Sequence, residues 1–180
     1  MANERKAEII IPFLVLLTFI VNMTLFKVLT VDVLTSSAYA KDIVYGAGQF
    51  IPAIKNFEKY SDFHFSSQCV YLANILMAVI FSFLISSKAK MKPMNWSAKH
   101  VKERAIGTPI LCVVAIVGFM FFFPGNPESA GFSAKINRSI YTSHFGFSFW
   151  FSVFFIGISV IVAISASWIS AYPKIFGWKK

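Results

Sequence analysis

The sequence predicts an all-α integral membrane protein, a four-helix bundle with its N- and C-termini both on the cytoplasmic side (N-in, C-in). Hydrophobic residues make up 57% of the 180 residues and charged residues only 14%. Soluble domains average about 45–50% apolar and about 25% charged residues. The apolar residues are gathered in four long runs, and the basic residues between these runs indicate the orientation.

The four apolar runs are the candidates for membrane-spanning helices. A helix needs about 20 residues to cross a hydrocarbon core about 30 Å thick. The first run can extend past Lys27, whose aliphatic stem lets its charge reach the interface. The runs lack the alternation of barrel strands, so helices are expected. The predicted helices are residues 9–29, 63–87, 105–124 and 145–170, within a single transmembrane domain of residues 1–180.

Lysine and arginine are unequally divided between the two sides that these helices define. The termini and the loop between the second and third helices carry eleven of them with three acidic residues. The other two loops carry six with five acidic residues. Because cytoplasmic segments carry the excess of basic residues, we expect both termini in the cytoplasm and a nearly neutral outer surface.

Two further features have competing interpretations. A net charge of +9 would suggest nucleic-acid binding in a soluble protein, but here the basic residues flank apolar runs. We therefore expect the lipid bilayer, and no nucleic acid, as their partner. Ala38-Tyr39-Ala40 resembles a signal-peptide cleavage site, yet the apolar run ends well before it at Phe26. An uncut first helix is expected, with cleavage at Ala40 as the alternative.

Few residues have the spacing that catalysis or cofactor binding requires. Cys69 and Cys112 stand alone without a Cys-x-x-Cys motif, so we interpret them as inert apolar residues. Ser143-His144 lacks a carboxylate to complete a triad. His64 and His144, at the outer ends of two helices, could clamp a haem, although interfacial histidines usually bond to water or headgroups. The predicted spans contain no Asp or Glu, which argues against ion-coupled transport. No catalytic residue, metal or cofactor is predicted.

A stripe of small residues runs along the fourth predicted helix. Its members recur at spacings of four or seven: Ser148, Ser152, Ser159, Ala163 and Ser167. Small residues allow helices to approach closely in lipid. The stripe therefore packs either against the chain's own helices or against a helix of another protein. The other side carries Phe149, Phe151 and Phe154, which suit lipid or an aromatic partner surface.

After the third predicted helix, the segment Asn126-Pro-Glu-Ser-Ala-Gly131 resembles a motif of a known family. It is similar to the Asn-x-Glu-Leu-Thr-Thr-Ala-Gly segment at the same place in immunity proteins against pore-forming colicins of the A and B type. Here the segment is two residues shorter and lacks the leucine. Ile51-Pro-Ala-Ile54 also resembles a Leu-Pro-Ser-Ile of that family. The family has about this length, four spans and cytoplasmic ends.

The resemblance implies an immunity protein in the bacterial inner membrane, which blocks a pore-forming bacteriocin by helix–helix contact with its pore domain. The residues expected to contact this partner are Asn126, Glu128, Ala130, Gly131, Ser148, Ser152 and Ser159. A structural or accessory subunit of a membrane complex would have the same composition and remains the alternative. A small b-type cytochrome using His64 and His144 is a third interpretation.

Overall fold

The computed structural model describes residues 2–29, 37–89, 101–128 and 130–177, and every regular element within these ranges is a helix. Four of the helices are long and apolar enough to cross a membrane. They are α1 (Ala2–Val28), α5 (His64–Ala89), α6 (Val101–Phe122) and α8 (His144–Ile175). The predicted all-α fold with four spans is therefore confirmed, and the chain is a multi-pass membrane protein.

The observed helices extend beyond several of the predicted ends. α1 begins at Ala2 and α6 at Val101 because helical hydrogen bonding continues into polar flanks that the apolar run does not mark. At its other end, α6 stops at Phe122, two residues before the predicted end at 124. α8 has 32 residues and is thus about 48 Å long at about 1.5 Å per residue, which exceeds the hydrocarbon thickness.

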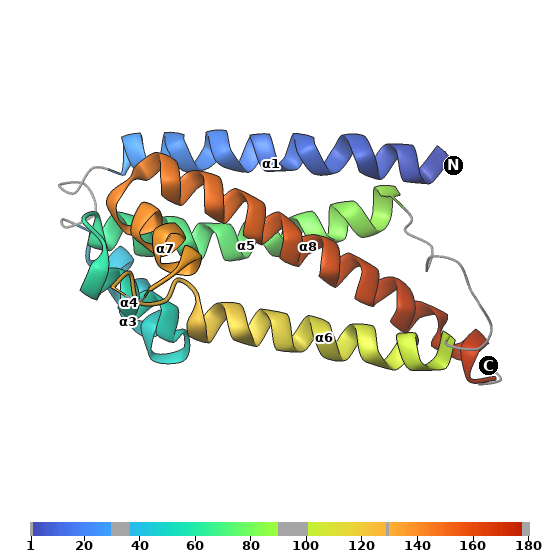
Figure 1. Cartoon of the computed structure of the whole chain (residues 1–180). Coiled ribbons are helices and arrows are strands. Elements are labelled where there is room, and N and C mark those ends of the chain that lie inside the picture. The colour runs from blue at the N-terminus through green and yellow to red at the C-terminus, as the bar shows by residue number, and fades with distance from the viewer. Residues whose placement is uncertain (1, 30–36, 90–100, 129, 178–180) are drawn as a thin grey trace.

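Helix α8 is the centre of the bundle and crosses it obliquely (Figure 1). It packs against α1, α5 and α6, and α1 also packs against α5. In contrast, α5 and α6 form no extensive contact with each other. The two ends of the described chain lie at the same end of the bundle, as an even number of spans requires (Figure 1).

Three shorter helices cover the other end of the bundle (Figure 1). They are α3 (Ala38–Phe50), α4 (Pro52–Tyr60) and α7 (Phe132–Thr142), and we refer to them, with the connection 123–131, as the cap. The hydroxyl of Ser37 accepts a hydrogen bond from the amide of Ala40 and so caps α3. Pro52 opens α4, where its missing N–H is not needed.

An aromatic core joins the cap to the bundle. Phe57 of α4 is fully buried, and its ring centroid lies 5.4 Å from that of Tyr71 on α5. It lies 5.6 Å from the ring of Phe147 and 6.0 Å from that of Phe151, both on α8. Because these distances are within the range of favourable aromatic pairs, the cap is anchored by packing as well as by chain connection.

Buried polar side chains link helices within the span. Asn22 of α1 and Asn74 of α5 are fully buried and exchange two amide hydrogen bonds, of 3.2 and 2.9 Å. The hydroxyl of Ser159 on α8 lies 3.0 Å from the carbonyl of Ala78 on α5. Neutral polar pairs of this kind contribute modestly to helix association in lipid, about 0.6 kcal/mol on average.

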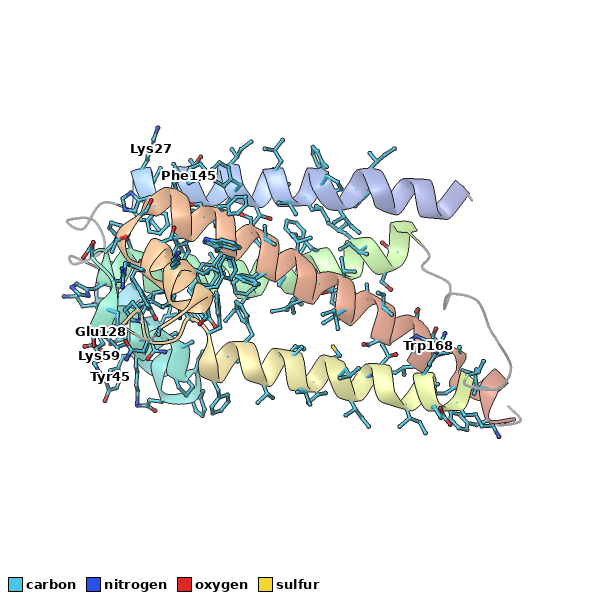
Figure 2. The ribbon with its side chains drawn as sticks, in the orientation of Figure 1. Lys27, Tyr45, Lys59, Glu128, Phe145 and Trp168 are labelled. Carbon is cyan, nitrogen blue, oxygen red and sulfur yellow. The ribbon has the colours of Figure 1, made fainter. Side chains whose placement is uncertain are left out.

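The end of the bundle away from the cap carries Trp168 (Figure 2). The side chain of Trp168 is largely buried and does not lie on the surface of the bundle. Nearby in the same helix, the Tyr172 hydroxyl donates a 2.7 Å hydrogen bond to the carbonyl of Ala105 on α6. This bond ties the C-terminal end of α8 to the start of α6.

Candidate functional site

The predicted loop residues lie on the surface of the cap, between the end of α6 and the start of α7. Figure 2 shows Glu128 at the cap end with Lys59 and Tyr45, far from Trp168. The exposed members of the predicted set are Asn126, Glu128, Ala130 and Gly131.

Hydrogen bonds from two cap helices hold the beginning of this loop in place. The Tyr141 hydroxyl of α7 donates to the carbonyls of Pro124, at 2.9 Å, and Gly125, at 3.1 Å. The side-chain amide of Asn56 in α4 donates to the Pro124 carbonyl at 2.8 Å. The loop is therefore attached to both helices that flank it in space.

The remainder of the loop has its own local order. The Asn126 side-chain oxygen accepts a 2.9 Å hydrogen bond from the backbone N–H of Glu128, which forms an Asx turn. Gly131 adopts φ of +99° at the start of α7, a conformation that L side chains rarely adopt. These two residues shape the backbone on which the Glu128 carboxylate is presented.

Charged groups on the cap face outward. The Lys59 ammonium lies 4.8 Å from the ring centroid of Tyr60, and the pKa of Lys59 is raised. The main cause is a hydrogen bond with Tyr60, followed by electrostatic interaction with Tyr60, with a smaller contribution from Glu128. The pKa of the Tyr141 hydroxyl is raised as well, chiefly by burial, so this group remains a neutral donor to the loop.

A hollow of about 390 Å³ lies between α3, α4 and α5, also at the cap. Its lining combines cationic, anionic and apolar side chains. They include Lys41, Tyr45, Lys55, Glu58, His64 and Gln68. The amide nitrogen of Gln68 donates to the carbonyl of Ile54 at 3.1 Å, so the floor of the hollow is fixed to α4.

The small-residue stripe faces the interior of the chain. Ser148, Ser152 and Ser159 are fully buried, and the hydroxyl of Ser159 reaches α5. The first of the two alternatives for the stripe is therefore the observed one, because α8 is the central helix and this face meets its neighbours. These three serines are not accessible to a partner in this structure, and we remove them from the candidate surface.

The aromatic face predicted for α8 is divided by the same packing. Phe149 is 44% exposed, whereas Phe151 is fully buried in the aromatic core against Phe57 and Tyr71. The prediction that Phe151 faces lipid or an aromatic partner surface was wrong. α8 has helices on several sides, so its buried surface is wider than one stripe.

The two candidate haem ligands have different surroundings. One ring nitrogen of His64 lies 3.3 Å from the carbonyl of Phe57. The His144 ring stacks on Phe26 at 4.5 Å and lies 4.0 Å from the ring of Phe63. Within the described residues, no group of three or more His, Cys, Asp or Glu is placed to hold a metal ion. Cys69 and Cys112 are both free thiols.

Helices α3, α4 and α7 were missed by reasoning from hydropathy. Each is too short or too polar to register as a span, but local signals were present. Pro52 marks a helix start, and Ala53, Ile54 and Phe57 recur with helical spacing on the buried face of α4.

Comparisons with protein-family models, with curated proteins and with solved structures found no match to this chain.

Proposed function

We propose that this chain is an immunity protein of the bacterial inner membrane that blocks a pore-forming bacteriocin by contact with its pore domain. The observation that carries the proposal is the Asn126–Gly131 segment. It resembles a segment of the colicin A and B immunity family, and its residues Asn126, Glu128, Ala130 and Gly131 are exposed on the cap. The attachment of the loop to Tyr141 and Asn56 supports a preformed contact surface, which lowers the entropic cost of binding.

The charge distribution supports an outward-facing cap. The basic termini and the 88–104 connection belong to the cytoplasmic side by the positive-inside rule. The cap would then face the periplasm, the side from which a bacteriocin reaches the inner membrane. This orientation is part of the proposal.

Within the bilayer, α6 offers the most accessible helix face for the contact. In the most apolar stretch of α6, only 11% of the residues are buried, whereas 44% are buried in the corresponding stretch of α8. Exposed apolar side chains along α6 include Ile110, Leu111, Val114 and Val117. Since α6 leads directly into the connection that carries the segment, we include both its exposed face and the exposed residues Asn126, Glu128, Ala130 and Gly131 in the candidate surface for a helix of the pore domain.

Inhibition by such a contact requires only a difference in affinity between two toxin states. A protein that binds the closed pore domain more tightly than the open channel shifts the population towards the closed state. About 5.5 kcal/mol of differential affinity moves a two-state equilibrium from 99% open to 99% closed. No catalytic chemistry is needed for this function.

The test uses potassium efflux from sensitive cells that express this chain and are challenged with a panel of pore-forming bacteriocins, including any that is encoded beside its gene. Expression should suppress the efflux, and it should give no protection against a nuclease toxin. Glu128→Lys should weaken protection because it reverses a charge on the candidate surface. Asp42→Lys, which makes the same charge change at an exposed position of α3, is the matched control and should protect normally.

Unchecked efflux in cells with normal membrane levels of the chain would refute the immunity function. The accessory-subunit interpretation, which the same exposed α6 face would serve, would then replace it. Equal loss of protection in Glu128→Lys and Asp42→Lys would show that net charge, rather than the 126–131 segment, is what matters.

A further inference from the structure

A groove opens between α5 and α6, with α8 as its floor. It has a volume of about 480 Å³, and all of its lining residues belong to the membrane-spanning parts of these three helices. The groove exists because α6 packs on α8 but makes no extensive contact with α5. Its walls and floor include Ala78, Ser82 and Ser86 of α5, Phe119 of α6, and Val162 and Ala163 of α8.

The groove is continuous with the lipid-facing surface of the bundle. Val79 and Phe83 of α5 line it and are also 52% and 73% exposed. In a protein whose α5 crosses the bilayer, side chains exposed at this level face hydrocarbon. Lipid chains can therefore enter the groove from the side without crossing a polar barrier.

Water is a poor occupant of this groove. A buried water typically needs about three hydrogen bonds to polar groups. The Ser82 hydroxyl already donates to the Ala78 carbonyl of its own helix at 2.7 Å. Of the described residues, Tyr71 and Ser148 have a buried side-chain oxygen without a hydrogen-bond partner, and neither lines the groove. An empty groove would also cost stability through lost dispersion contacts.

The lined stretch of α5 extends from Ile75 to Ser86, a rise of about 17 Å at about 1.5 Å per residue. Because the groove is apolar and opens sideways at the level of the exposed side chains of α5, the hydrocarbon of the bilayer is in direct contact with it. We propose that one acyl chain of a bilayer phospholipid occupies this groove and completes the packing between α5 and α6.

The proposal is tested by native mass spectrometry. The protein is reconstituted in vesicles of phosphatidylethanolamine and phosphatidylglycerol and extracted with a mild non-ionic detergent. The wild-type protein should retain one phospholipid. Ser86→Phe and Val162→Phe should lose it, since both substitutions place a ring in the groove.

Two neighbouring positions provide matched controls. Ser87 and Ile161 are exposed and adjoin Ser86 and Val162, but neither lines the groove. Ser87→Phe and Ile161→Phe should retain the phospholipid as the wild type does. Each groove variant and its control form a pair, one on α5 and one on α8. If one groove variant fails to fold, the pair on the other helix still tests the proposal.

Retention of no phospholipid by the wild type, or equal retention by groove and control variants, would overturn the proposal. If the groove variants kept the lipid but lost protection against the toxin, the occupant would be a protein helix. This result would also overturn the lipid proposal. Lipid loss confined to Ser86→Phe and Val162→Phe, with protection unchanged, would support the lipid site independently of the immunity function.

Discussion

Phe57 is the residue on which the attachment of the cap depends most. Its ring is fully buried and lies close to those of Tyr71, Tyr141, Phe147 and Phe151, which belong to three different helices. α4 has only nine residues, and an isolated helix of that length is unstable in water. Packing of this one ring therefore stabilises both α4 and its position on the bundle.

Phe57→Ala should lower the free energy of unfolding by about 3–5 kcal/mol, as expected for a large-to-small change in a packed core. Phe50→Ala, in the same cap but at a ring that is 77% exposed, should change it by no more than about 0.5 kcal/mol. The effects of the two substitutions are compared through the rate at which the buried Cys112 thiol becomes reactive in detergent, because this thiol reacts when the structure opens. Equal effects of the two substitutions would show that the aromatic core does not anchor the cap.

Tyr141 connects the cap to the candidate loop, and Tyr141→Phe should remove both hydrogen bonds to 124–125. The expected loss is about 1 kcal/mol, because Asn56 still donates to the Pro124 carbonyl. Tyr39→Phe, at a side chain that is 84% exposed, is the control for removal of a hydroxyl. Identical thermal stabilities of Tyr141→Phe and wild type would contradict the role assigned to these bonds.

The raised pKa of Tyr141 also predicts a dependence on pH. Burial favours the neutral phenol in the folded state, so the contribution of Tyr141 is complete below the unfolded-state pKa of about 10. It should be lost as pH rises through and above that value, because the unfolded chain then releases the proton more readily. Stability measured between pH 8 and 11 should fall less steeply in Tyr141→Phe than in wild type; parallel curves would exclude this group as a cause.

At the scale of elements, α8 is distinguished by contacts on several sides. Its stripe of small residues lets it approach α5 closely, and its aromatic residues pack against both the cap and α6. Its length allows it to meet α7 at one end and the start of α6 at the other. The remaining spans are organised around this helix.

Ser152→Leu should therefore destabilise the bundle by about 1–3 kcal/mol through overpacking, since Ser152 is fully buried. Gly157→Leu, on the same helix, should be tolerated because a Cβ added there meets no atom within 4 Å. Thermal unfolding of the two purified variants provides the comparison. A stable Ser152→Leu variant would place this face of α8 towards lipid and restore the serines as candidate partner contacts.

At the scale of the whole molecule, the cap and the termini lie at opposite ends of the bundle (Figure 1). Orientation in the membrane can be tested with single cysteines placed at Glu128 and Lys102, after Cys69 and Cys112 are replaced by serine. Both sites are exposed. A membrane-impermeant maleimide should label Glu128→Cys in intact cells and label Lys102→Cys only after lysis. Labelling of Lys102→Cys in intact cells would reverse the assignment, and the cysteine-free protein provides the background.

The number of spans and their approximate positions could be predicted from the sequence alone. Insertion depends on the summed transfer free energy of a contiguous run, and this is a local property that can be read from residues such as 105–124. The candidate segment 126–131 was also found from the sequence, through its resemblance to a short family motif.

The buried faces of the helices could not be predicted from the sequence and became known from the packing of the helices. Lipid and protein interior are about equally apolar, so hydrophobicity along a spanning helix does not distinguish the side that packs from the side that meets lipid. For this reason Ser152 and Phe151 were assigned to possible partner or lipid contacts although both are inside the bundle. The anchoring of α4 by Phe57 and the groove between α5 and α6 likewise depend on residues far apart in the chain, whose approach is set by how the helices pack.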